Sequence, residues 1–199
     1  MLKSKFLEKK KIIKNIIIPL LGLHNVKNAT SALSVAFSIG VSDGAIKSGL
    51  KNFNGVQRRF NYLFKKNNTL FFDDYAHHPT EISCVLDGVK KVYKNEEIIC
   101  IFQPHRISRL KKLKYDFSRC FKKADTVLLC PIYNAWENIK LGFSYHSFAK
   151  SLTRNSKVKL IILKNEDDLK KIVNNLAFGN KIFIAMGAGS ISNWVRKLN

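Results

Sequence analysis

The chain has 199 residues, of which 35 are Lys or Arg and 14 are Asp or Glu, so its formal net charge is +21 at neutral pH. Hydrophobic residues make up 46% and aromatic residues 11%, which is enough for a packed core and excludes a disordered chain. The longest apolar run, residues 16–23, is far shorter than the roughly 20 residues of a membrane-spanning helix. No signal-peptide cleavage site follows the basic N-terminus, so we expect a cytoplasmic protein with no membrane partner.

The basic charge is spread through almost every segment and consists mainly of lysine. Such a charge is typical of nucleic-acid binders, but the sequence has no zinc-finger spacing, no RRM-type aromatic octamer and no basic stripe with interleaved aromatics. We therefore expect no nucleic-acid partner, although a nucleic-acid-associated protein stays an alternative. A milder interpretation is that the charge attracts an anionic small-molecule substrate.

The predicted elements begin with helices. Residues 1–18 show no clear local structure, whereas apolar residues at helical spacing predict a helix over 24–39. Gly40 ends it, and Ser42 or Asp43 can cap a second helix that runs to about residue 52.

Strand and helix patterns alternate after residue 58. A hairpin of two strands is expected at 60–64 and 69–72. Further strands are expected at 98–102, 126–130, 158–163 and 181–185, and helices at 79–93, 108–121, 145–152, 166–176 and 190–198. This alternation predicts an α/β fold, Rossmann-like, with a mostly parallel sheet and helices on both faces. The four cysteines form no C-x-x-C pair, and buried free thiols are expected at Cys100 and Cys130 within the strands.

Polar residues gather directly after the predicted strands, where doubly wound sheets bind ligands. The segments are 73–79, 103–109, 131–137 and 187–190. His105, Arg106 and Arg109 at a helix start predict an anion site through their charge and the helix dipole. His77 and His78 lack further ligands at suitable spacing, so no metal site is predicted. A ligand-binding role is favoured for the aspartates at 73–74, with turn and cap residues as the alternative, and the glycines at 187 and 189 suit either tight packing or ligand contact.

Five of these motifs, taken together, resemble the C-terminal part of Mur ligases. They are LHNVKNA at 23–29, FNGVQRRF at 53–60, DDYAHHPTE at 73–81, FQPHRISR at 102–109 and GAGSI at 187–191. They occur in the family's order and cover about residues 20–191. The run at 103–106 is most similar to the members that join L-alanine to UDP-N-acetylmuramate.

The resemblance implies ATP-dependent amide formation in peptidoglycan synthesis, and hence a part in cell-wall biogenesis, cell shape and cell division. The family phosphorylates the carboxylate of UDP-N-acetylmuramate, and the amine of L-alanine then attacks the acyl phosphate. Mg²⁺ and cationic side chains stabilise the charge that develops. The implied ligands are thus ATP and Mg²⁺, with Mg²⁺ held mostly by domains outside this sequence.

The resemblance also implies a nucleotide-binding set. Asn25 and Asn28 match the family's adenine-contacting pair, with His24 beside them, and an amide offers a base edge both a donor and an acceptor. Arg59 and Asp74 match nucleotide-contacting positions of the C-terminal domain.

A second implied set holds the amino acid. His105, Arg106 and Arg109 match the cluster of catalytic candidates that binds it, and a guanidinium suits the alanine carboxylate. Tyr75 and His77 line the same site. The loop after the third parallel-type strand departs from the family's Ala-Gly-Glu pattern because Trp136 replaces the glycine, which would alter the turn if this position needs a positive φ.

The domain prediction is a remnant of the central ATP-binding domain at 1–57, expected to be helical, followed by the C-terminal domain at 58–199. The sequence has no G-x-x-x-x-G-K-[ST] phosphate loop and no UDP-sugar domain, so we expect the chain to need these parts as partners and to be inactive alone. A non-catalytic module that kept the fold and binds nucleotide or amino acid stays the alternative.

Overall fold

The computed structural model describes residues 2–8, 11–20, 23–137 and 142–199. Two compact units divide the chain, Met1–Val56 and Gln57–Asn199. Each has its own hydrophobic core, and each is described separately below.

The first unit joins a hairpin to two helices. Strand β1 (Leu2–Glu8) pairs antiparallel with β2 (Lys11–Ile18), and helices α1 (Leu23–Ser38) and α2 (Asp43–Asn52) follow. Both helices were predicted, and Ser42 caps α2 by accepting a hydrogen bond from the Ala45 amide at 3.4 Å. The hairpin was not predicted, since residues 1–18 gave no clear local structure, so the segment expected to be helical is a mixture of strands and helices.

A β-bulge explains why the sequence concealed the hairpin. The pairing advances from Ser4↔Ile16 to Phe6↔Ile13, which places one extra residue in β2, and Asn15 there has a positive φ of 59°. The bulge changes the phase of the strand. Ile13, Ile16 and Ile18 are consequently all buried although they do not alternate strictly.

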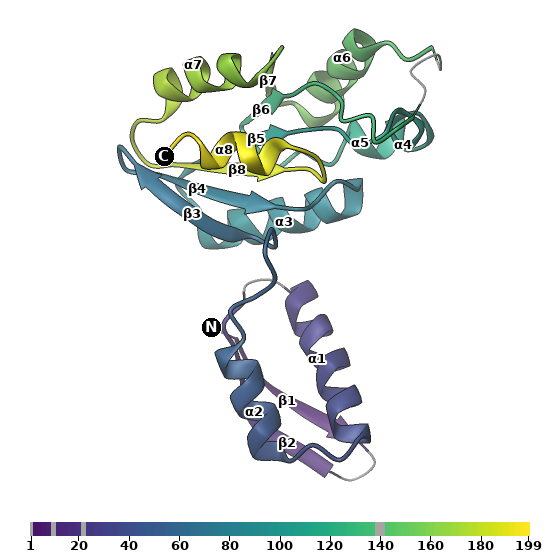
Figure 1. The fold of residues 1–199 in the computed structure, drawn as a ribbon, viewed down its shortest axis with the longest axis vertical. Helices are drawn as coiled ribbons and strands as arrows, with labels where there is room; N and C mark the ends of the chain where they lie inside the picture. The colour runs from purple at the N-terminus through teal and green to yellow at the C-terminus, as the bar shows by residue number, and fades with distance from the viewer. Residues whose placement is uncertain (1, 9–10, 21–22, 138–141) are drawn as a thin grey trace. The chain divides into compact units, whose positions relative to one another are not determined.

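The second unit contains a six-stranded sheet with the order β3-β4-β8-β5-β6-β7 (Figure 1). Only the edge strand β3 is antiparallel to its neighbour. The strands are β3 (Asn61–Lys66), β4 (Thr69–Asp74), β5 (Glu97–Phe102), β6 (Thr126–Leu129), β7 (Lys159–Ile162) and β8 (Lys181–Met186). The central strands are buried on both sides, as parallel strands covered by helices require.

Helices cover both faces of this sheet and confirm the predicted α/β fold. One core holds the apolar sides of α3 (Pro79–Val92), α4 (Ile107–Lys112), α5 (Lys114–Phe117) and α6 (Tyr145–Ser156). The opposite core holds those of α7 (Glu166–Leu176) and α8 (Ile191–Arg196). The single helix expected at 108–121 is instead two short helices, because Leu113 leaves the helical conformation at φ −111° and ψ 23°.

The topology places a switch point at the carboxyl ends of three strands. The loops after β4 and β5 lead to helices on one face, whereas the loop after β8, which lies between those strands, leads to α8 on the other. Such a divergence is where open α/β sheets bind ligands. Among the described residues, no helix has the length and apolarity to cross a membrane.

Candidate functional site at the strand ends

Asp73, near the end of β4, is a completely buried carboxylate held by the C-terminal helix. Its Oδ2 accepts hydrogen bonds from the Ser192 hydroxyl at 2.5 Å and from the Arg196 guanidinium at 3.1 Å. Its Oδ1 has no hydrogen-bond partner and lies 4.0 Å from Nε of Arg58, which is also unpaired. The sequence placed Asp73 in a polar strand-end cluster but could not show this ion pair, because Arg196 lies 123 residues away.

Asp74 uses both carboxylate oxygens on the backbone. Oδ1 accepts from the Ala76 amide at 2.7 Å, and Oδ2 accepts from the Phe60 amide at 2.8 Å. Burial raises the pKa of Asp74 to about 6, against the opposing effects of the two amide hydrogen bonds and of Arg59. These contacts fix the loop that precedes β3 and the turn that follows β4, so Asp74 holds the backbone that carries Arg59 and Tyr75.

Arg58 and Arg59 bracket the ring of Tyr75. The guanidinium carbons lie 4.8 Å and 5.9 Å from its centroid, within the range of cation–π attraction. Arg58 also donates to the carbonyl oxygens of Gly187 and Gly189, which secures the loop after β8. Arg59 is exposed and its guanidinium makes no hydrogen bond or ion pair with the described residues, so its charge is open to a ligand.

An aromatic row crosses the ends of β4, β5 and β6. The ring centroids of Tyr75 and His77 are 5.2 Å apart, those of His77 and His105 are 5.6 Å apart, and His105 stacks on Tyr133 at 5.6 Å. A parallel bridge and two backbone hydrogen bonds tie the segment around His105 to Tyr133. The structure therefore brings together Tyr75, His77 and His105 as predicted, and adds Tyr133, which the motifs did not assign.

His105 is a neutral imidazole at neutral pH. Burial lowers its pKa, and the Arg109 charge adds to the effect. Its Nδ1 lies 3.3 Å from Nη1 of Arg109, and because a guanidinium only donates, Nδ1 accepts. The proton of His105 is then on Nε2, which leaves the imidazole as a hydrogen-bond donor within the row.

The helix-dipole part of the predicted anion site is corrected by Glu137. The Glu137 carboxylate accepts hydrogen bonds from the amide and the hydroxyl of Ser108, so an acidic side chain already occupies the start of α4. These bonds lower the pKa of Glu137. What remains at this end of β5 is side-chain charge: Arg106 is exposed with φ 69°, and Arg109 is half-buried against His105.

The glycines of the loop after β8 are required for packing. A Cβ on Gly187 would lie 2.8 Å from the carbonyl oxygen of Gln103, and one on Gly189 would lie 2.6 Å from Cγ of Tyr133. Gln103 also bonds Ser190 and the Ile191 amide, both at 3.1 Å. This close approach seats α8 beside the aromatic row and supports the packing interpretation of the Gly-Ala-Gly motif.

Trp136 occupies a turn that closes through a hydrogen bond from the Glu137 amide to the Asn134 carbonyl at 3.1 Å. Both central residues have positive φ, 48° at Ala135 and 69° at Trp136, as in a type I′ turn. The position where the family pattern has glycine therefore does adopt a left-handed conformation. Tryptophan adopts it with its side chain fully exposed.

His78 and the cysteines have structural roles. The Nδ1 of His78 accepts from the Thr80 amide at 3.3 Å while Glu81 accepts from the His78 amide at 3.2 Å, so the pair forms a capping box for α3. Cys100, Cys120 and Cys130 are buried free thiols whose pKa values burial raises, and Cys84 is exposed. Among the described side chains, no group of three or more His, Cys, Asp or Glu could hold a metal ion.

The predicted adenine-contacting residues belong to the other unit. His24, Asn25 and Asn28 lie in the first two turns of α1, where Asn25 is half-buried and Asn28 is exposed. The side chain of His24 lies outside the described part of the chain.

Comparison with known proteins agrees with this arrangement. A family model described as the glutamate ligase domain of Mur ligases matches residues 58–189. The chain belongs to the Mur ligase family. Among curated relatives, the UDP-N-acetylmuramate–L-alanine ligase of Pelagibacter ubique is 60% identical over 94% of this chain and 40% of its own length, and that of Agrobacterium fabrum is 40% identical over 93% and 39%. The chain thus spans about 40% of the length of these Mur ligases.

Solved structures support the same membership. UDP-N-acetylmuramate–alanine ligase MurC from Thermotoga maritima is 28% identical, with a TM-score of 0.76 over 94% of this chain and 41% of that one. A murein peptide ligase from Psychrobacter arcticus is 27% identical, with a TM-score of 0.72 over 96% and 39%. The ADP complex of Mycobacterium tuberculosis folylpolyglutamate synthase, 15% identical with a TM-score of 0.68 over 94% and 42%, shares the fold. The resemblance deduced from five motifs is confirmed.

Proposed function

We propose that this chain supplies the C-terminal part of a cytoplasmic, ATP-dependent ligase that joins L-alanine to UDP-N-acetylmuramate. The observation that carries the proposal is the 60% identity, over nearly the whole chain, to a relative named for that activity. The strand-end site agrees with it, because cations and a neutral imidazole donor converge where a carboxylate and a developing oxyanion would need them.

The two arginines of the β5 end are assigned to the amino acid. The Arg106 guanidinium is exposed, and Arg109 is held by His105, so together they can grip the carboxylate of L-alanine. His105 is assigned as a donor through Nε2, and Tyr75 and His77 form the wall on the β4 side. The amine of L-alanine then attacks the acyl phosphate of UDP-N-acetylmuramate, and phosphate leaves.

Each unit supplies its own candidate residues for the nucleotide. Arg59 offers an uncommitted positive charge to phosphate, and Asn25 and Asn28 offer amide edges to adenine. Asp74, which the motif assigns to nucleotide contact, is proposed to act through the backbone it holds, since each of its oxygens already accepts an amide hydrogen bond.

Mg²⁺ does not fit the residues described here. No cluster of carboxylates or imidazoles among them provides a cation site, and the sequence contains no phosphate loop. We therefore assign Mg²⁺ and the UDP-sugar to Mur domains beyond this sequence and propose that the 199-residue chain is inactive alone. Release of phosphate by the chain alone with UDP-N-acetylmuramate, L-alanine and Mg-ATP would contradict this.

The test is ligation after the chain is combined with UDP-sugar and central domains from a Mur ligase. Arg106→Ala and Arg59→Ala are each expected to lower kcat/KM by at least about 100-fold, a loss of roughly 3 kcal/mol of transition-state stabilisation. Arg119→Ala is the matched control, since Arg119 lies over Tyr115 away from the strand ends. Activity that survived both site variants would favour a non-catalytic module with the Mur ligase fold.

A further inference from the structure

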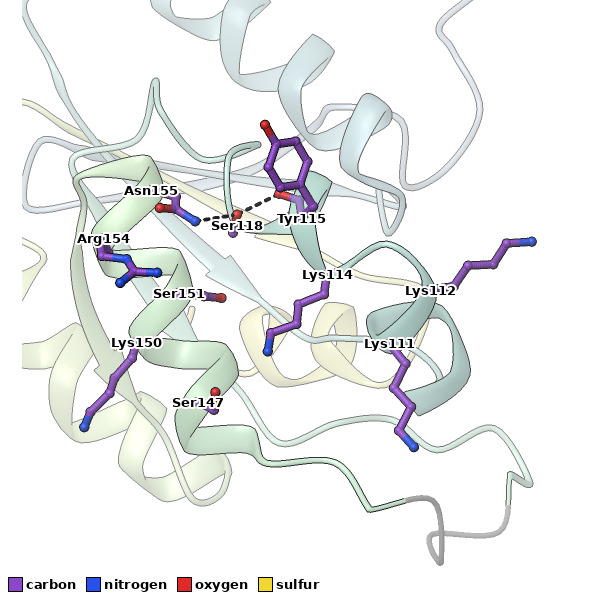
Figure 2. A pocket seen from close by; sticks show the side chains of 10 residues that line it. All are labelled: Lys111, Lys112, Lys114, Tyr115, Ser118, Ser147, Lys150, Ser151, Arg154 and Asn155. Atoms are coloured by element: carbon purple, nitrogen blue, oxygen red, sulfur yellow. Dashed lines mark hydrogen bonds between the residues drawn. The ribbon is translucent and has the colours of Figure 1, made fainter.

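A second polar feature of the Gln57–Asn199 unit lies away from the strand-end residues. It is a groove of about 740 Å³ between α4–α5 and α6 (Figure 2). Five of its ten lining residues are cations and none is acidic. The lining consists of Lys111, Lys112, Lys114, Tyr115, Ser118, Ser147, Lys150, Ser151, Arg154 and Asn155.

The positive charges of the groove are not neutralised by the described parts of the chain. None of its lysines, nor Arg154, forms an ion pair with a described carboxylate within 4.0 Å. Figure 2 shows Lys114 extending toward α6 and Arg154 lying along α6, while Lys112 and Lys150 extend outward. Like charges held together on low-dielectric walls focus a field that attracts an anion.

The groove offers charge without converging directional donors. Ser118 at its floor is buried, donates to the Tyr115 carbonyl at 2.7 Å and accepts from Asn155 at 2.9 Å. The Ser151 hydroxyl donates to the Phe148 carbonyl at 2.7 Å. A compact phosphorylated metabolite is normally oriented by a few precisely placed donors, so the groove suits a longer anion better.

The spacing of cations on α6 matches an extended peptide. Lys150 and Arg154 lie four residues apart on α6, a rise of about 6 Å. Side chains on one side of an extended peptide repeat every two residues, about 6.6 Å. Tyr115, the one aromatic residue in the lining, already has the Arg119 guanidinium 4.1 Å from its ring centroid, so the groove lacks a row of free stacking rings.

We propose that the groove between α4–α5 and α6 is a docking site for an acidic segment of another polypeptide. The segment binds in extended form, with carboxylates at alternate positions. Lys150 and Arg154 line the α6 side of the groove, and Lys111 and Lys114 line the α4–α5 side. The nine residues of α6 from Ser147 to Asn155 span about 12 Å, which accommodates about four extended residues. The site is independent of ligation, and its occupant brings a second protein to the ligase.

The test measures binding of a fluorescent peptide, in which glutamate alternates with threonine, to the full 199-residue chain. Binding is expected at about 50 mM salt and should weaken steeply by about 200 mM. The double variant Lys150→Glu, Arg154→Glu should weaken it at least tenfold. The control Lys90→Glu, Lys91→Glu makes the same charge change near the end of α3 and should weaken it less than threefold.

Several outcomes would overturn the proposal. One is equal weakening by the two double variants, because this would show attraction to net charge alone. Another is equally tight binding of a peptide with the same composition but its glutamates in one block, since the spacing argument would then fail. Tighter binding of oligo-thymidine or of tripolyphosphate through Lys150 and Arg154 would replace the polypeptide with nucleic acid or a small polyanion. Circular dichroism of each variant checks that the fold is retained.

Discussion

The carboxyl ends of β4 and β5 lie at the same edge of the sheet, separated by β8. Their polar residues nevertheless differ in burial and in hydrogen bonding. At the β4 end, Asp73 and Asp74 are buried, and three of their four carboxylate oxygens accept hydrogen bonds from donors of the fold itself. At the β5 end, Arg106 is exposed and the neutral His105 keeps one ring nitrogen as a donor. The sequence presents both ends as polar clusters, and only the contacts separate a supporting cluster from one that can bind a ligand.

Substitutions at the β4 end and at the β5 end should therefore have different consequences. Substitutions at Asp73 or Asp74 should reduce the free energy of unfolding, because the buried donors that bond these carboxylates lose their acceptors. Variants of the exposed β5 cations should reduce ligation and leave stability within about 0.5 kcal/mol. The predictions below test this division, beginning with the largest effect.

The largest effect is expected at the buried ion pair. Arg196→Met leaves the buried Asp73 carboxylate with Ser192 and the more distant Arg58, so the free energy of unfolding should fall by about 3–5 kcal/mol, nearer the lower value because Arg196 is half exposed. Urea denaturation measures the loss. Adding Asp73→Asn should restore part of it, since the uncompensated charge is removed. Arg154→Met, on α6, is the control and should change stability by less than about 0.5 kcal/mol. Equal losses in the two arginine variants would show that the Asp73–Arg196 ion pair does not stabilise the fold.

The next effect concerns Asp74 and pH. Its pKa is raised from 3.8 to about 6 in the folded chain, so between these values the folded state binds more protons than the unfolded state. The stabilisation is fully present below about pH 4 and is lost as the pH rises through 6, a change of ~3 kcal/mol at most.

Asp74→Asn removes this titration. The difference in unfolding free energy, wild type minus variant, should therefore decrease between pH 4.5 and about 6.5. Chemical denaturation at several pH values measures it. A difference that stayed constant with pH, or increased, would show that the two amide hydrogen bonds outweigh burial at this carboxylate.

A smaller effect is expected where the two ends meet the loop after β8. The Cβ of Gly189→Ala would lie 2.5 Å from Oε1 of Gln103 and 2.6 Å from the Tyr133 ring, so one of them must move. We expect a loss of about 1–3 kcal/mol and displacement of the His105 ring that stacks on Tyr133. NMR titration of the His105 imidazole measures the displacement. Gly88→Ala on α3, where a Cβ meets nothing within 4 Å, is the control.

The fold was largely predictable because the parallel strands are short apolar runs between helices with clear capping signals. Ser42 before α2 and Pro79 in the first turn of α3 are examples that residue preference alone can locate. The β1–β2 hairpin was not, because the bulge at Asn15 disrupts the alternation on which strand prediction depends. The break at Leu113 was also missed, since neither glycine nor proline marks it.

The sequence motifs predicted which residues gather at the candidate site, but not all of the contacts that those residues make. Motifs located the row of Tyr75, His77 and His105, but the partner of Asp73 could not be found from sequence because it depends on α8 returning to the β4 end. Likewise, the Glu137 carboxylate at the start of α4 comes from the next strand's loop. Long-range pairing of this kind is set by the fold and leaves no local pattern.

The smallest predicted effect is a gain in stability at Trp136. A non-glycine residue in the left-handed region costs about 1 kcal/mol, and the exposed indole has no packing against the described residues that would offset this cost. Trp136→Gly relieves the strain but adds chain entropy to the unfolded state, so the net gain should be about 0.5 kcal/mol. Trp136→Ala keeps the strain and should leave stability unchanged, which makes it the matched control. If both variants instead lost stability equally, the indole would have a packing role in the free chain, and the loop after β6 would join the β4 end as a supporting region.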